Sequence, residues 1–224
     1  MLDILFKSDG SPRDTFIELA GYLFALIVGF MMHELAHGYV AKWNGDDTAK
    51  LAGRLTFNPL KHLDLLGTVC LLLFGFGWAK PVPINTRNFR HFRRGFFAVA
   101  IAGVTMNLIL ALFFTGAYHL RSFAEPALTA TELGATIAYL LYAFTYYSIF
   151  VNLMLMIFNL MPVAPLDGFR VLEALGEGKS RIIDKYIDFM RRYGFMTIII
   201  IIAFNNLGLF SAIIGWFADI LGIK

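Results

Sequence analysis

Long apolar runs separated by short polar stretches divide the chain into segments that could cross a membrane. The first run covers about residues 15–43, the second about 95–118 and the third about 133–160. Each could cross roughly 30 Å of hydrocarbon as a helix rising about 1.5 Å per residue. A last apolar segment, residues 193–222, is interrupted by an Asn-Asn pair. The pattern predicts an all-α polytopic membrane protein with about four full spans.

A shorter apolar run at residues 65–79 is marginal for a full span. The segment that follows, residues 80–94, contains two prolines and five Lys or Arg residues. Proline lacks a backbone donor and disfavours helix in the residue before it, so this segment predicts extended or turn-like backbone. We expect residues 65–79 to enter the membrane and return, or to lie along its surface. An extended PVPIN element at residues 81–85 should follow.

Composition supports a membrane location, and the distribution of charge indicates the orientation. Hydrophobic residues make up 58% of the 224 positions and charged residues 16%, whereas a soluble domain is usually about a quarter charged. Lys and Arg gather in the loops after the first, the short and the third run, while residues 119–132 contain only Arg121. The positive-inside rule places the three basic regions in the cytoplasm. The net charge of +3 then reflects loops facing an anionic leaflet, and no nucleic-acid partner is expected.

The first apolar run contains three ionisable groups within five residues. His33, Glu34 and His37 form the pattern H-E-x-x-H. On a helix, positions i and i+4 share a face, so both imidazoles can bind one metal ion. Glu34 lies beside them, where it can accept a proton from metal-bound water. Because ionisable groups at membrane depth are costly, they are functional candidates, and histidines that merely pack within a bundle are the weaker interpretation.

A catalytic zinc site needs three protein ligands and an open position. The single cysteine, Cys70, excludes a site with two or more thiolates. Asp167 is the preferred third ligand, because it follows two prolines at the end of the third run, where an acid needs a cation. Its alternative role is the N-cap of the helix that follows. His62 and Asp64 are weaker candidates, and Asp64 is expected to be the N-cap of the short run.

The motifs taken together resemble a known family. HELAH on an apolar run, followed by GWAKPVPIN, AGVTMN and FNLMPVAPLDG, is similar to the site-2 protease family of intramembrane metalloproteases. The resemblance is to the compact prokaryotic branch without a PDZ or CBS domain. From Asn159 to Gly168 the last motif matches the family pattern N-L-x-P-x-x-x-L-D-G, whereas Val104 stands where the family has proline. We expect residues 1–224 to form a single domain, with its catalytic core at about 15–175 and a C-terminal membrane segment at 193–222.

The resemblance implies a ligand set and a substrate. It implies one zinc ion per chain on His33, His37 and Asp167, with Glu34 as general base. Asn159 and Asn107 are implied to position the scissile carbonyl or its oxyanion, although Asn107 could equally hydrogen-bond between helices. The implied substrates are transmembrane helices of single-pass proteins or signal-peptide remnants, cleaved in the bilayer of a prokaryotic cell at a site that opens to the cytoplasm. A homo-oligomer is left open.

Two other classes of function would use the same residues. A metal transporter could hold an ion in transit on the His/His/Asp cluster, but it has no need for Glu34 between the ligands. The chain also has no vestibule rich in His or acidic residues. An inactive scaffold that binds a partner helix is disfavoured by the intact HELAH and LDG motifs. The sequence therefore favours a membrane-embedded zinc metalloendopeptidase of the HExxH type.

Overall fold

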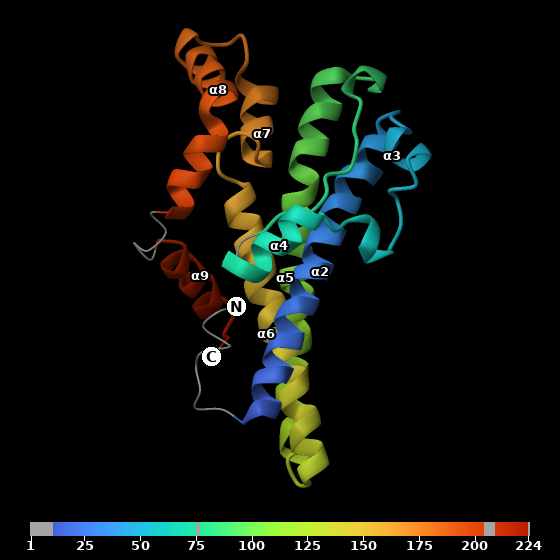
Figure 1. Cartoon of the computed structure of the whole chain (residues 1–224), viewed down its shortest axis with the longest axis vertical. Coiled ribbons are helices and arrows are strands. Elements are labelled where there is room, and N and C mark those ends of the chain that lie inside the picture. The colour runs from blue at the N-terminus through green and yellow to red at the C-terminus, as the bar shows by residue number, and fades with distance from the viewer. Residues whose placement is uncertain (1–10, 75–76, 204–208, 224) are drawn as a thin grey trace.

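The computed structural model describes residues 11–74, 77–203 and 209–223, and in these residues the regular secondary structure is helical. An isolated antiparallel bridge joins Leu63 to Ala79, and within the described residues no strand forms. The helices, shown in Figure 1, are α2 (Pro12–Trp43), α3 (Thr48–Leu51), η1 (Pro59–Lys61), α4 (Leu65–Phe74), η2 (Thr86–Asn88), α5 (Phe92–Leu128), α6 (Glu132–Asn159), α7 (Asp167–Gly176), α8 (Arg181–Ala203) and α9 (Leu209–Ile220).

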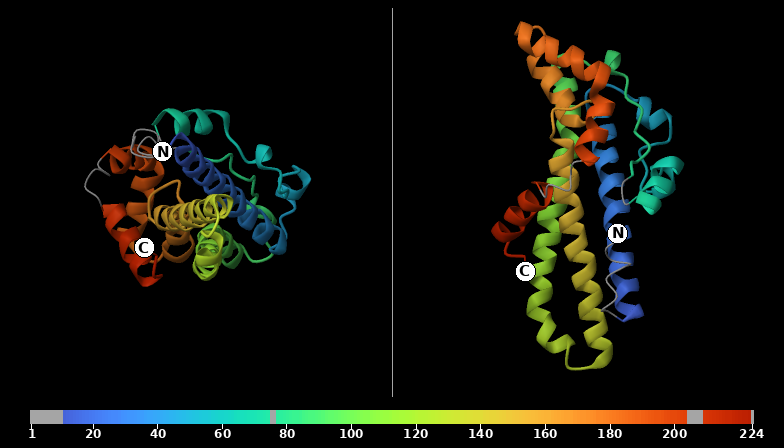
Figure 2. Two further views of the ribbon diagram at one scale, coloured as in Figure 1. Left: turned by 90° about the horizontal axis from the view of Figure 1, so that it is seen from below. Right: turned by 60° about the vertical axis from the view of Figure 1, so that its left-hand side comes forward.

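Helices α2, α5 and α6 pack side by side as the central bundle (Figures 1 and 2). Among the described residues, these three helices are long and apolar enough to cross a membrane. They correspond to the three runs expected at residues 15–43, 95–118 and 133–160, and the all-α membrane fold is confirmed. Helix α5 extends beyond its expected end to Leu128 and forms a hairpin with α6.

Local signals in the sequence account for the helix starts. The Ser11 hydroxyl accepts a hydrogen bond from the backbone N–H of Asp14, and Pro12 occupies the first turn of α2, where its missing N–H costs nothing. The Thr131 hydroxyl caps α6 in the same way by accepting from the N–H of Gly134. At α4, the Asp64 carboxylate accepts from the N–H of Gly67, which confirms its expected role as a cap.

Residues 79–88, which we call the strap, cross the face of α2 without forming a long helix. The Arg54 side chain donates to the backbone oxygens of Lys80 (2.6 Å) and Pro81 (3.1 Å). Asp46 accepts from the N–H of Asn85 and from the Asn88 amide, each at 2.7 Å. The strap is therefore held at both ends by buried charged side chains, with Pro81 at the first anchor and Pro83 between the two.

Asp46 has no exposed surface, yet it is strongly bonded. Burial by itself would raise its pKa, but the hydrogen bonds from Thr48, Asn85 and Asn88 outweigh burial and lower the pKa of Asp46 below its ordinary value. Asp46 is thus a carboxylate at neutral pH, and it joins the end of α2 to the strap.

Helix α8 covers the loop between α6 and α7. A cluster that includes Phe169, Ile187 and Met190 fills the space between α7 and α8. The Tyr186 hydroxyl donates to the backbone oxygen of Pro162 at 2.7 Å, so α8 is bonded to the loop that leads into α7. This contact supports the start of α7 from the side opposite the central bundle.

The apolar segment expected at residues 193–222 is described in two parts, residues 193–203 and 209–222. Its first part belongs to α8 and its last part is α9, which packs against α6. The Asn-Asn pair expected to interrupt it, Asn205–Asn206, lies outside the described residues. A fourth full span therefore stays a prediction.

Candidate metal centre

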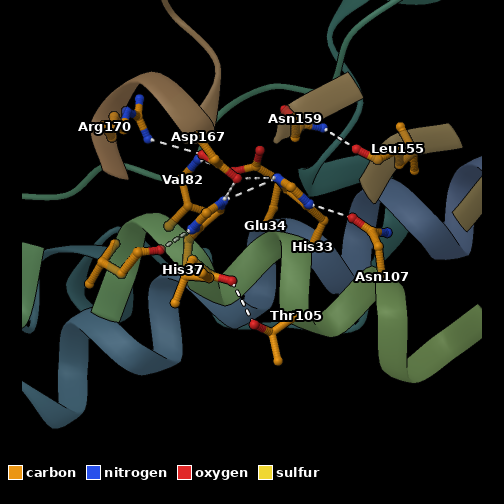
Figure 3. A network of polar contacts seen from close by, with 12 residues as sticks. His33, Glu34, His37, Val82, Thr105, Asn107, Leu155, Asn159, Asp167 and Arg170 are labelled. Atoms are coloured by element: carbon orange, nitrogen blue, oxygen red, sulfur yellow. Dashed lines mark hydrogen bonds and ion pairs between the residues drawn. The ribbon is translucent and has the colours of Figure 1, made fainter. Parts of the chain in front are cut away.

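Three buried side chains from distant parts of the chain converge where α2 meets the start of α7 (Figure 3). His33 and His37 lie one turn apart on α2, and Asp167 is the first residue of α7. The two Nε2 atoms are 3.1 Å apart. Asp167 Oδ2 lies 3.2 Å from His33 Nε2 and 3.1 Å from His37 Nε2. In the part of the chain that the structure describes, this is the one group of His, Cys, Asp or Glu found suitable for a metal ion.

The other ring nitrogens show which tautomer each histidine adopts. His37 Nδ1 lies 2.7 Å from the backbone oxygen of Val99, which can only accept, so this nitrogen carries the proton. His33 Nδ1 lies 2.6 Å from Asn107 Oδ1 and donates to it. In a neutral imidazole, a proton on Nδ1 leaves Nε2 unprotonated, so each ring can offer that nitrogen to a metal ion. Hydrogen bonds of this kind orient metal-binding histidines.

The cluster fits zinc. Two Nε2 lone pairs and the Asp167 carboxylate face one point, and Asp167 Oδ2 is buried without a hydrogen bond of acceptable geometry. Three electron-rich atoms this close repel one another unless a cation lies between them. A tetrahedral zinc ion with bonds of about 2.0–2.1 Å separates its ligand atoms by roughly 3.3–3.4 Å, close to the observed spacing. Three ligands also leave the fourth position open.

Asp167 is directed at the histidines and does not cap its own helix. The N-cap position of α7 is Leu166, which makes no side-chain cap, so the alternative role considered for Asp167 is not seen. Gly168 permits this start: a Cβ there would lie 2.1 Å from the backbone oxygen of Leu160.

Glu34 reaches the strap. Its Oε2 accepts a hydrogen bond of 2.7 Å from the backbone N–H of Val82 (Figure 3). Val82 itself is buried against α2, near Gly38. The strap therefore places a backbone donor on the carboxylate that the sequence predicts to be the general base, and it lies beside the site.

The remaining sequence candidates lie in other environments. His62 is buried, but its Nε2 bonds to the backbone oxygen of Thr56 at 2.8 Å, so His62 is not part of the cluster. Asn159 donates to the backbone oxygen of Leu155 in its own helix, at 2.9 Å. Asn107 uses its oxygen for His33 and its nitrogen for neighbours on α2 and α6. The oxyanion role of both asparagines stays a prediction.

Two residues next to the cluster carried no assigned role in the sequence. Gly103 on α5 faces the imidazoles: a Cβ there would lie 2.4 Å from His33 Cε1 and 2.5 Å from each Nε2. Asn152 on α6 accepts from Asn107 at 2.9 Å. Gly103 belongs to the AGVTMN motif that also contains Asn107, so the motif could have indicated that Gly103 lies near the site. Asn152 lies in an apolar run, where a buried amide was the only indication.

Comparison with known proteins gives concordant results. Residues 21–201 match the sequence pattern of the protein family described as "Peptidase family M50". A Bacillus subtilis (strain 168) protein named "Putative zinc metalloprotease YwhC" is 47% identical over 165 residues, which cover 71% of each chain. "Putative zinc metalloprotease Rip2" of Mycolicibacterium smegmatis is 27% identical over 218 residues, 93% of this chain and 78% of the relative. No solved structure matches this chain.

Proposed function

Because this chain belongs to peptidase family M50, the site-2 proteases, and is a zinc protease of the membrane, we propose that it cleaves transmembrane helices. The substrates are single-pass membrane proteins or signal-peptide remnants. His33, His37 and Asp167 hold the zinc ion, and Glu34 is the general base. The observation that carries the proposal is the convergence of two imidazole Nε2 atoms and one carboxylate, with spacings of 3.1–3.2 Å, beside Glu34.

The residues divide the chemistry of peptide hydrolysis between them. Bound zinc supplies Lewis acidity for water activation and carbonyl polarisation. Glu34 accepts the proton of the attacking water and passes it to the leaving amine. The N–H of Val82 holds the Glu34 carboxylate in place at 2.7 Å. Asn159, at the end of α6, is proposed to assist in positioning the scissile carbonyl.

A transmembrane helix must unwind before its peptide bonds can react, because its backbone groups are paired internally. We propose that the strap receives the unwound segment by strand addition, in which main-chain hydrogen bonds hold an extended peptide. The basic residues of the loops that follow the first, the short and the third apolar run support a site that opens to the cytoplasm. Ile84→Pro tests this step, because it removes a strap donor and leaves the ligands in place. Val82→Pro is less informative, since it would also remove the donor to Glu34.

The decisive experiment replaces Glu34 with Gln in protein reconstituted into lipid vesicles with a single-pass substrate. We expect zinc to be retained and cleavage to be lost. Glu18→Gln is the matched control: it lies on the same helix, but its oxygens bind Tyr139 and Tyr147, far from the cluster. Cleavage by Glu34→Gln at the wild-type rate would overturn the proposal. If the wild type cleaves no substrate and Glu34→Gln still transports zinc, the alternative function of a metal transporter would be favoured.

A further inference from the structure

A chain of buried side-chain hydrogen bonds runs from the metal centre across two helices. His33 Nδ1 bonds to Asn107 Oδ1 at 2.6 Å. Asn107 Nδ2 donates to Asn152 Oδ1 at 2.9 Å and to the backbone oxygen of Gly29 at 3.4 Å. Asn152 Nδ2 then donates to the backbone oxygen of Ser148 at 2.8 Å. Both asparagines have no exposed surface, so water cannot replace these partners.

The groups at the two ends of this series of hydrogen bonds determine which way each asparagine amide is turned. The Ser148 backbone oxygen can only accept, so Asn152 must turn its nitrogen toward it and its oxygen toward Asn107. Asn107 then meets two oxygens, those of Asn152 and Gly29, and must present its nitrogen to them. The oxygen of Asn107 is left for His33. A reversed amide at either position would place oxygen against oxygen in a buried site, which is strongly unfavourable.

This direction matters for metal binding, because Asn107 as an acceptor requires the proton of His33 to be on Nδ1. His33 Nε2 is then unprotonated and faces His37 and Asp167. Asn107 oriented the other way would present N–H groups to Nδ1 and favour a proton on Nε2, the nitrogen needed for the metal. Asn152, which makes the shorter of the two bonds to the Asn107 nitrogen, therefore favours the tautomer of His33 that can bind a metal ion.

We propose that Asn152 is a positioning residue for the zinc ligand His33 and that it acts through Asn107. The inference rests on the proposed function, in which His33 binds zinc. Asn152 does not touch the metal or the substrate; it orients the amide that orients the ligand. Partners of metal-binding histidines typically change metal affinity about 10–100-fold when they are removed.

The test measures zinc affinity of the purified full chain by competition with a chelator, together with the absorption spectrum of the cobalt-substituted protein. Asn152→Leu keeps the branching and the number of side-chain heavy atoms but lacks the acceptor, and we expect zinc affinity to fall about 10–100-fold with an altered cobalt spectrum. Asn152→Asp should retain affinity close to that of the wild type, because a carboxyl kept neutral by burial offers the same acceptor and donor. Asn152→Ala replaces the leucine variant if that variant does not fold.

A double-mutant cycle separates positioning from general destabilisation. If Asn152 acts through Asn107, then Asn152→Leu should cause no further loss of zinc affinity in an Asn107→Leu background. A purely structural role would give additive losses. Thr145→Val is the matched control: it removes another buried polar group from α6, one that bonds only to its own helix, and it should leave zinc affinity unchanged.

The outcomes distinguish this inference from the proposed function. Wild-type zinc affinity and an unchanged cobalt spectrum in Asn152→Leu would overturn the positioning role, whether or not the protein cleaves substrate. Additive losses in the cycle would also overturn it. The opposite result is also possible: zinc affinity depends on Asn152, but the wild-type protein cleaves no membrane substrate. That result would refute the proposed function and leave the positioning role intact.

Discussion

Gly103 faces the metal centre from α5, and Gly103→Ala should disable the site while the fold persists. In the structure, a Cβ on residue 103 would lie 2.4 Å from His33 Cε1 and 2.5 Å from both His33 Nε2 and His37 Nε2. The obstructing atoms are the ring atoms that the metal requires. One methyl group would therefore separate α5 from α2 or turn the imidazoles away from Asp167.

The size of the effect follows from these distances. Carbon atoms in ordinary contact lie about 3.5 Å or more apart, so Gly103→Ala demands a shift of roughly 1 Å. Functional constellations tolerate about 0.5 Å, and a misplacement of about 1 Å can reduce catalysis about 100-fold. This corresponds to about 2.8 kcal/mol. Overpacking costs about 1–3 kcal/mol of stability, partly offset by about 0.5–1 kcal/mol from replacing glycine within a helix.

The assay compares zinc affinity, cleavage rate and helical content of Gly103→Ala with those of Gly116→Ala. Gly116 lies on the same helix, and a Cβ there would meet no atom within 4 Å. We expect the control to keep zinc affinity and cleavage, and Gly103→Ala to lose about 100-fold in cleavage together with zinc affinity. Wild-type zinc affinity and cleavage in Gly103→Ala would show that the close packing of α5 against the imidazoles is not as described.

Three further predictions concern the strap and the metal. Asp46→Asn should lower the free energy of unfolding by about 1.5–3 kcal/mol, measured by thermal denaturation, because one amide oxygen replaces two carboxylate acceptors. Because folding lowers the pKa of Asp46, this carboxylate stabilises the wild-type fold fully at pH values above its pKa in the unfolded chain, about 3.9. That stabilisation is lost as the pH falls through the lower pKa of the folded state. Equal loss of stability in acid by the wild type and Asp46→Asn would contradict this prediction. Arg54→Met should slow cleavage at unchanged zinc content, because two strap oxygens lose their donor and Val82 shifts away from Glu34; a wild-type rate would count against a role of the strap at the site. Chelator treatment should abolish cleavage and added zinc should restore it in the wild type but not in His37→Ala, as measured by cleavage and metal content, and activity that resists metal removal would exclude a zinc-dependent reaction.

The sequence by itself was sufficient for features that depend on local chemistry. Hydropathy located the three helices of the central bundle, because crossing hydrocarbon requires a long apolar helix whatever its neighbours are. The spacing of His33 and His37 placed both imidazoles on one face, since helical periodicity is a local property. Asp64 at the start of α4 was predictable for the same reason. Asp167 was selected because an acid that follows two prolines at the end of an apolar run needs a cation, and the resemblance of its motif to that of a known family implied the same ligand.

Tertiary structure alone decided how the helices turn toward one another. In lipid, the membrane-facing and the buried faces of a helix are both apolar, so the sequence of α5 or α6 does not show which residues point inward. For this reason the contact of Gly103 with the imidazoles, and the position of Asn152 behind Asn107, could not be read from their apolar runs. The bond between Val82 and Glu34 depends likewise on a strap anchored by distant charges, because hydrogen bonds between segments far apart in the chain exist only once the fold brings them together.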